Sequence, residues 1–247
     1  MKTLLLATAV AVVLASPAFT ADLQPLVGKA PPGAYNWTGL YYGGHCGGAR
    51  ADTKTTGDRG AFDETDNEVY NLRPTGWVCG GQLGFNMQIS GWLWGIEADL
   101  GYLGLKATIT QRSAPRNFVE VKYGAYGVAA TRAGVVVDRA LLYAKAGVAF
   151  ARIRNTAADL DGGTVIDPSD FTEIDKTHIG WAAGTGLEYS LSSSWSFKLE
   201  YLYMDFGKDN STNQDRDQFT HRNSVHTLKA GFNWHFGGGP ALTTNYY

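Results

Sequence analysis

Histidine is the side chain best suited to acid–base or metal chemistry near neutral pH, and this chain contains five of them. They are His45, His178, His221, His226 and His235. None belongs to a His-Glu-x-x-His zinc motif, and the chain has neither a Gly-x-Ser-x-Gly elbow nor a phosphate-binding loop. Metalloprotease, hydrolase-elbow and nucleotide-binding activities therefore lack support. We expect no enzyme activity, no catalytic residue, no cofactor and no metal.

Two alternatives use some of these histidines. His178 and His221, with tyrosines of nearby loops, could ligate haem iron, because both residue types serve as axial ligands. His226-Thr227 could form half of a site that hydrolyses lipid acyl chains, together with a carboxylate at the rim. Residues of these types are also common in surface loops and at lipid interfaces. Haem binding and lipid modification therefore stay alternatives to a non-enzymatic role.

The two cysteines, Cys46 and Cys79, are too few for a zinc site. Their number suits one disulfide in an oxidising, exported environment. Both side chains fall on the same face of the strands described below. The alternative is a pair of free thiols at the rim.

The N-terminus has the pattern of a secretory signal peptide. Met1-Lys2 precedes an apolar run from Leu4 to Ala15 and the small-residue sequence SPAFTA, which predicts a signal peptide over residues 1–21. The alternative is a membrane anchor, but the apolar run is shorter than the roughly 20 residues of a spanning helix. A Pro-containing periplasmic linker is expected over 22–34. The net charge of −2 gives no basic field for nucleic acid.

The mature chain is predicted to be all-β. It contains 31 glycines and 13% aromatic residues, with only 18% charged residues, and period-two alternation dominates. The eight alternating segments are 36–47, 77–89, 92–105, 119–137, 140–152, 177–190, 195–206 and 225–236. Long and short connections follow one another strictly, which places all long loops at one end of an antiparallel sheet. Outer-membrane barrels have this asymmetry.

The segment GGQLGFNMQI shows which face is outside. Leu83 and Phe85 alternate with Gln82, Gly84 and Asn86 along the strand. A membrane barrel turns the apolar face to lipid and encloses the polar one. A soluble lipocalin-like barrel, the rival fold, would reverse the faces. The glycines of the polar face favour the membrane reading, because a narrow barrel must alternate large and small side chains inside.

Ionisable residues on the polar faces balance one another, as an enclosed interior requires. The predicted interior ion-pair network contains Glu97, Asp99, Glu120, Lys122, Arg132, Lys145, Glu188, Lys198, Glu200 and Lys229. Aromatic residues gather near the strand ends, where interfacial girdles form. The predicted girdle contains Trp77, Trp92, Trp94, Trp195, Trp234 and Phe236. We therefore predict an eight-stranded antiparallel up-and-down transmembrane β-barrel with a polar side-chain-filled interior over residues 35–236.

Several segments carry a family likeness. YNWTGLYYGG, GWLWGIEADLGY, GWAAGTGLEYSLSSSWSFKLEYLYMDFG and HTLKAGFNWHF together resemble the porin-like outer-membrane β-barrel proteins of alphaproteobacteria. That family includes the outer-membrane immunogenic proteins and is similar in architecture to the OmpA transmembrane domain. One departure is the tail over 237–247, because family members typically end at the last aromatic residue of the final strand.

The resemblance implies a bacterial outer-membrane protein that supports the cell envelope and exposes loops as surface antigens. Its implied partners are outer-membrane lipids and lipopolysaccharide, and the barrel-assembly machinery during insertion. A small-solute diffusion porin is an alternative, as are a haem-binding surface receptor and a lipid A-modifying enzyme. The motifs that carry the likeness concern fold and location, and none of them supplies residues for an activity.

Overall fold

Alternating side chains produce β-strands throughout the part of the chain that the structure describes. The computed structural model describes residues 35–57, 69–110, 118–158, 171–212, 218–237 and 239–240. The expected signal peptide, the expected linker and most of the expected tail lie outside the described residues and stay predictions. Within the described residues, no helix is long and apolar enough to cross a membrane.

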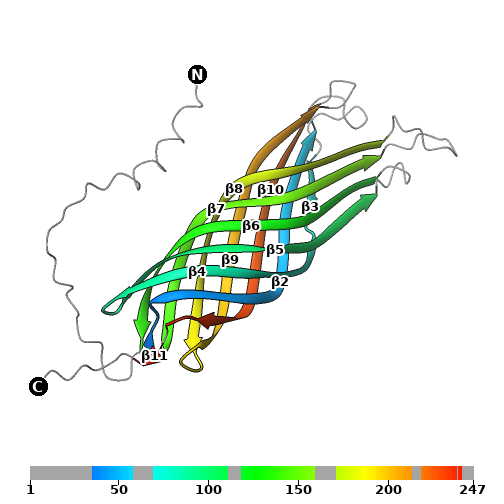
Figure 1. Ribbon diagram of the computed structural model, residues 1–247. Helices are drawn as coiled ribbons and strands as arrows, with labels where there is room; N and C mark the ends of the chain where they lie inside the picture. Colours follow the sequence, from blue (N-terminus) through cyan, green and yellow to red (C-terminus); the bar gives the residue numbers. More distant parts are fainter. Residues whose placement is uncertain are drawn as a thin grey trace, which may run out of the picture.

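Eight antiparallel strands form a closed barrel, which confirms the predicted fold (Figure 1). They are β2 (Gly39–Gly57), β4 (Thr75–Ile89), β5 (Trp92–Thr110), β6 (Phe118–Val137), β7 (Ala140–Ala158), β8 (Phe171–Ser190), β9 (Trp195–Thr212) and β10 (Gln218–His235). Each of these strands pairs with the next one along the chain, and β10 also pairs with β2, which closes the sheet. A short strand, β3 (Val69–Leu72), pairs with the far part of β2.

Tight turns gather at one end of the barrel, here called the tight-turn end. Ser90-Gly91 joins β4 to β5, and Asp138-Arg139 joins β6 to β7. Ser90 and Asp138 have φ angles of 57° and 54°, the left-handed conformation that two-residue hairpins use. The opposite end is the long-loop end. In outer-membrane barrels the short turns face the periplasm and the long loops face the exterior.

A strap formed by residues 35–38 crosses the mouth of the barrel at the tight-turn end. It begins with β1 (Tyr35–Asn36), which pairs with β11 (Gly239–Pro240) outside the barrel sheet (Figure 1). The sequence had placed a barrel strand from residue 36, but β2 begins at Gly39. The difference arises because Tyr35 and Trp37 turn into the lumen, where both side chains are buried.

The strands extend farther toward the long-loop end than the sequence indicated. The predicted ends at 152 and 177 become Ala158 in β7 and Phe171 in β8. Beyond Phe150 the outward side chains of β7 change from apolar to charged. This change ended the apolar–polar alternation by which the sequence analysis recognised the strand, although the backbone pairing of β7 with β8 continues. Strands of about 19 residues measure roughly 65 Å, whereas roughly 9–11 residues suffice to cross a bilayer. About half of each strand therefore lies beyond the membrane.

A bulge in β6 overturns part of the predicted inward face. The alternation had placed Glu120, Lys122 and Arg132 inside, but Lys122 is 45% exposed and pairs with Glu120 on the outer surface. The register with β7 shifts between Tyr123 and Tyr126, where one additional β6 residue reverses the alternation. Arg132, beyond the bulge, does face inward. The network prediction is therefore wrong for Glu120 and Lys122.

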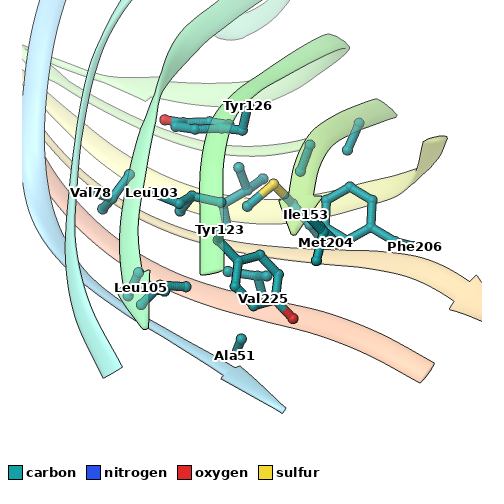
Figure 2. Packing of buried hydrophobic residues seen from close by; sticks show 14 of the residues in the cluster. Ala51, Val78, Leu103, Leu105, Tyr123, Tyr126, Ile153, Met204, Phe206 and Val225 are labelled. Atoms are coloured by element: carbon teal, nitrogen blue, oxygen red, sulfur yellow. The ribbon is translucent and has the colours of Figure 1, made fainter. Parts of the chain in front are cut away.

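The interior has a polar half toward the tight-turn end and an apolar half toward the long-loop end. A polar filling was expected throughout. Figure 2 shows the apolar layer, in which side chains from strands all round the barrel meet. Its larger members are Leu72, Val78, Leu103, Leu105, Val121, Tyr123, Tyr126, Ile153, Met204, Phe206 and Val225. Apolar filling needs no hydrogen-bond partners, so it closes this part of the cylinder without a desolvation cost.

We expect spin labels to distinguish the two environments of the outer surface. Leu199→Cys should report lipid, because Leu199 points outward within the apolar band of β9, whereas Lys122→Cys should report water. Oxygen and a water-soluble nickel complex would serve as the two relaxing agents. No free cysteine occurs among the described residues, so each label has one site. A lumenal, nickel-protected signal at position 122 would contradict the assigned bulge.

Candidate functional site in the barrel lumen

Eight ionised side chains form a lumenal network in the polar half of the interior. They are Glu97, Asp99, Arg132, Lys145, Glu188, Lys198, Glu200 and Lys229, and each is at most 4% exposed. They come from the inward positions of six neighbouring strands, β5 to β10. Four carboxylates meet four cations, so the network is formally neutral. Removing the Glu120–Lys122 pair from the predicted set removes one charge of each sign and keeps this balance.

Glu97 lies among three of the cations. Lys145 Nζ donates to Glu97 Oε1 at 2.7 Å, and the Tyr41 hydroxyl donates to Glu97 Oε2 at 2.7 Å. Arg132 Nη1 and Lys198 Nζ lie 3.5 and 3.8 Å from the second oxygen. Both carboxylate oxygens are therefore compensated. The Tyr41 and Arg132 side chains also stack, with the guanidinium carbon 4.5 Å from the ring centre.

Asp99 and Glu200 bind the remaining lysines. Lys229 Nζ lies 2.6 Å from Asp99 Oδ2 and 3.1 Å from Glu200 Oε1, and Lys145 Nζ lies 2.8 Å from the same Glu200 oxygen. Tyrosine hydroxyls complete the shell. Tyr126 donates to Asp99 at 3.0 Å and Tyr143 donates to Glu200 at 2.8 Å. The lysines thus bridge carboxylates from β5 and β9 across the lumen.

A group of three carboxylates could in principle hold a metal ion. Oxygens of Glu97, Asp99 and Glu200 lie within 4.8 Å of one another. However, Lys145 and Lys229 already contact these same oxygens, as the distances above show. Their charges take the place that a cation would fill. The group is therefore part of the ion-pair network.

Ser196, His235 and Glu188 bring together the residue types of a hydrolase triad. Ser196 Oγ and Glu188 Oε1 lie 2.8 and 3.1 Å from the same ring nitrogen, His235 Nε2. A catalytic histidine instead uses one nitrogen for the nucleophile and the other for the orienting carboxylate. Ser196 also donates directly to Glu188 at 2.5 Å. All three side chains are buried, so this arrangement positions Glu188 and offers no reactive centre.

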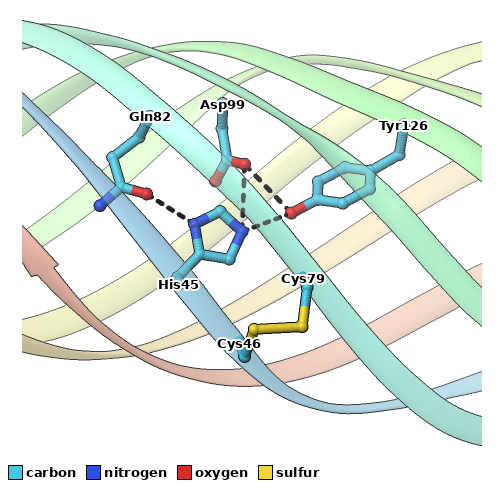
Figure 3. The surroundings of a disulfide bond; sticks show 6 residues. All are labelled: His45, Cys46, Cys79, Gln82, Asp99 and Tyr126. Atoms are coloured by element: carbon cyan, nitrogen blue, oxygen red, sulfur yellow. Dashed lines mark hydrogen bonds and ion pairs between the residues drawn. A yellow bond between two sulfur atoms is a disulfide. The ribbon is translucent and has the colours of Figure 1, made fainter.

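His45 joins the network to the wall formed by β2 and β4 (Figure 3). Its Nδ1 lies 2.6 Å from Gln82 Oε1, and its Nε2 lies 2.8 Å from the Tyr126 hydroxyl. On the outer face of the same two strands, the structure joins Cys46 and Cys79 in a disulfide. The two cysteines are direct cross-strand partners. Of the two states that the sequence left open, the structure contains the oxidised one.

The predicted girdle residues all lie on the outer face. Trp92, Trp94, Trp195 and Phe236 are exposed near the tight-turn end, where Trp195 also packs against Trp234 at 4.9 Å between ring centres. Trp77 stacks on Tyr102 at 5.7 Å farther along the barrel. A further pair at the long-loop side of the apolar band, Trp181 and Tyr203, was not expected from the sequence.

Sequence reasoning missed the inward tyrosines that bind the network. Tyr41, Tyr126 and Tyr143 were assigned no role in the sequence analysis, yet all three are buried in the lumen. The missed signal was glycine on a neighbouring strand. A Cβ at Gly84 would overlap the Tyr41 ring, and one at Gly186 would overlap the Tyr143 ring. Trp37, which packs 5.3 Å from His235 and is fully buried, had no comparable signal.

The histidines considered for chemistry do not form the expected pairs. His226 lies on the outer face, with Nδ1 2.7 Å from the Tyr201 hydroxyl and Nε2 3.7 Å from Asp52. Thr227 points inward and donates to the Leu202 carbonyl, so it cannot act with His226. His178 lies on β8, and the side chain of His221 lies outside the described residues.

Two carboxylates outside the apolar band are held ionised by cations. Hydrogen bonds from Lys106 and then Lys122 lower the pKa of Glu120 to about 2. Hydrogen bonds from Arg152 and then Arg154 lower the pKa of Asp175 to about 2. These pairs belong to the part of the barrel wall beyond the membrane.

Comparison with known proteins gives consistent matches. Residues 6–236 match the family described as outer membrane protein beta-barrel domain. The 31 kDa outer-membrane immunogenic protein of Brucella melitensis is 30% identical over 247 residues, which cover 96% of this chain and 100% of that protein. The 22 kDa outer membrane protein of Rhizobium leguminosarum is 29% identical over 80% of this chain and 77% of that protein. The crystal structure of OprG from Pseudomonas aeruginosa has a TM-score of 0.49 and 14% identity, over 81% of this chain and 98% of that chain.

Replacing a carboxylate of the network should destabilise the barrel strongly. Glu97→Gln should lower the free energy of unfolding by about 3–5 kcal/mol, because it leaves buried cations uncompensated. Glu120→Gln is the matched control at a solvent-facing pair and should cost less than about 1 kcal/mol. Urea titration of the folded protein in lipid vesicles would measure both. Equal losses for the two variants would contradict the buried network.

The Glu120 carboxyl should titrate unusually late as the pH falls. Its pKa is depressed, so its ion pairs contribute stability above about pH 4.5 and lose it as the pH falls through about 2. Lys106→Gln should raise the midpoint of the titration, because it removes the hydrogen bond with the largest effect. Carbon-13 NMR of the side-chain carboxyl would follow both proteins. A midpoint near pH 4.5 in the unmodified chain would show that the pairs do not form.

Proposed function

This chain belongs to the outer-membrane β-barrel family matched above, and we propose that it is a closed, non-conducting barrel with a structural role in the envelope. Its location in the bacterial outer membrane follows from the family and from its outer-membrane relatives. The predicted family and localisation are confirmed. As a member of that family it is a surface protein of the envelope. The proposal concerns the absence of a channel and of catalysis.

The observation that carries the proposal is a lumen filled by three layers in series. Nearest the tight-turn end, Tyr35 and Trp37 of the strap pack over Leu93, Leu141 and Tyr143. The lumenal network forms the second layer. The apolar layer in Figure 2 forms the third. A solute would have to displace side chains from all three.

The strap is tied to the barrel wall rather than resting on it. Its backbone amides at Tyr35 and Trp37 donate to the Asp138 carbonyl at 3.0 Å and to the Gln88 side chain at 2.8 Å. The Tyr35 hydroxyl donates to the Ser193 carbonyl at 2.7 Å. These three acceptors lie at or beside three different hairpin turns. The first layer is therefore held at several points around the mouth.

The second and third layers oppose ion passage in different ways. The four fixed cations and four fixed carboxylates neutralise one another in charge, so an entering ion meets no net counter-charge. In the apolar layer an ion would lose its hydration, and the Tyr123 hydroxyl there is already hydrogen-bonded to Thr53 and Asn223. This loss costs several kcal/mol even after relaxation. Each layer alone opposes conduction, and together they favour a structural barrel over a diffusion porin.

The absence of catalysis is supported by the burial and orientation of the candidate catalytic residues in the described part of the chain. The Ser196–His235–Glu188 group is sealed within the lumen, and Thr227 faces away from His226. The outer surface instead presents a broad apolar band and long strand extensions toward the exterior. This arrangement suits a protein that anchors in the membrane and displays loops.

Planar-bilayer recording tests the proposal directly. The refolded protein should give no steady unitary conductance, because the three layers are in series. Trp37→Ala should stay closed as well, since it opens only the first layer. A general diffusion porin in the same bilayers provides the positive control, and the heat-dependent mobility shift shows that each sample is folded. Stable conductance steps from the unmodified barrel would overturn the proposal in favour of a porin.

A further inference from the structure

The pairing of β2 with β4 lacks the ion pairs that favour one register on the other strands. All eight residues of the lumenal network lie on β5 to β10, and none of them lies on β2 or β4. This strand pair instead carries the covalent bond between Cys46 and Cys79, which are direct cross-strand partners (Figure 3). The disulfide is therefore a candidate for the role that ion pairs have elsewhere.

Every inward cross-strand pair of β2 and β4 contains a glycine. The pairs are Gly39 with Asn86, Tyr41 with Gly84, Gly43 with Gln82, His45 with Gly80, Gly47 with Val78, and Ala49 with Gly76. The larger side chains occupy the space opposite these glycines, as a Cβ at Gly84 would overlap the Tyr41 ring. Glycine thus recurs at every fourth residue on the inward face of each strand.

This repeat leaves one slip of β2 against β4 without a packing penalty. A one-residue slip would exchange the two faces, and a two-residue slip would place Tyr41 opposite Gln82. A four-residue slip places Tyr41 opposite Gly80 in one direction and His45 opposite Gly84 in the other. Glycine-rich strands specify their register weakly for this reason. The neutral hydrogen bond between His45 and Gln82 contributes less than the ion pairs of the other strands.

The position of the disulfide limits when it can form. The next outward pair toward the long-loop end is Gly48 with Trp77, and Gly48 also pairs with Leu228. Trp77 and Leu228 are 52% and 55% exposed on the lipid-facing surface, so the disulfide lies within the apolar band. Thiol oxidation proceeds through a thiolate, and hydrocarbon has no water to solvate that anion. The bond must therefore form before the barrel enters the membrane.

We propose that a thiol–disulfide oxidoreductase of the periplasm joins Cys46 to Cys79 before insertion, and that this bond selects the native register of β2 against β4 over the four-residue slip. One cysteine thiolate attacks the disulfide of the oxidoreductase and forms a mixed disulfide, which the second cysteine thiolate resolves. The chain loses two electrons and two protons, and the oxidoreductase takes up both and leaves as a dithiol.

Distance explains why the bond excludes the slip. A disulfide cannot join Cα atoms more than about 7 Å apart without backbone movement. A four-residue slip would separate Cys46 from Cys79 by about 13 Å along the strands. The oxidised chain can therefore pair β2 with β4 in the native register and not in the slipped one.

Cross-linking of the full-length chain tests the register. All variants carry Cys46→Ser, so Cys79 can bond only to one introduced cysteine. Tyr42→Cys and Arg50→Cys lie opposite Cys79 after four-residue slips, whereas Gly44→Cys and Gly48→Cys lie opposite it after two-residue slips. During refolding into lipid vesicles in a glutathione redox buffer, we expect at least about threefold larger cross-linked fractions for the four-residue slips. Equal fractions, or larger ones for the two-residue slips, would overturn the proposal.

The design controls for chance encounters and for the assigned pairing. The four variants close loops of similar length, so an unfolded chain would favour neither set. A chain with both native cysteines replaced by serine then receives Gly44→Cys and Gly81→Cys, which are direct partners in the native register. This pair should cross-link in the inserted barrel. Its failure to do so would show that the assigned pairing is wrong and would reject the proposal as well.

Reduction kinetics test whether the bond precedes insertion. In the inserted barrel, a water-soluble phosphine should reduce the native disulfide at least about tenfold more slowly than one engineered by Lys106→Cys and Lys122→Cys in the chain without native cysteines. Lys106 and Lys122 are direct partners outside the apolar band, with side chains 58% and 45% exposed. Equal rates would show that water reaches the native disulfide and would reject oxidation before insertion. The heat-dependent mobility shift verifies folding of each protein.

Discussion

Mutual neutralisation of buried charge is the constraint on which the rest of this barrel depends. Four carboxylates and four cations lie in the lumen with almost no contact with water. Each is tolerable only because a partner from another strand stands within a few ångströms, as Lys145 does for Glu97 and Lys229 does for Asp99. A one-residue slip in any of the strands from β5 to β10 would turn its network charge toward lipid and leave the partners of that charge uncompensated. The ion-pair network therefore stabilises one register of strand pairing, and only that register brings the charges together.

The interior changes chemistry along its axis for a related reason. Charged pairs occupy the half enclosed by the membrane, where inward polar positions alternate with outward apolar ones. Nearer the long-loop end the outer wall is itself charged, and Leu103, Leu105 and Ile153 fill the inside. Along strands such as β6 and β7 the inward face is thus polar within the bilayer and apolar beyond it, and the outward face changes in the opposite sense. The extended part of the barrel resembles a soluble β-sheet with its core inside.

Much of the architecture was readable in the sequence because one physical rule, period-two alternation, acts along every strand. That rule gave the strand number, the tight turns and eight network residues that the structure brings together. It failed at Glu120 and Lys122, because a single additional residue in β6 inverts the faces and leaves no mark in the composition. It also failed at the strap, where Trp37 lies between β1 and β2 and belongs to neither strand. The apolar layer was missed because the polarity inversion beyond the membrane breaks the pattern used to recognise lipid-facing positions.

The strap has a consequence for the order of assembly. Its anchoring groups belong to Gln88, Asp138 and Ser193, and its partner strand β11 comes from the far end of the chain. Residues 35–38 are the first of the described part to be synthesised, yet the groups that bind them are in place only after all three tight-turn hairpins have formed. The earliest segment must therefore be the last to dock. The strap can therefore close the mouth only when the ring of strands is complete.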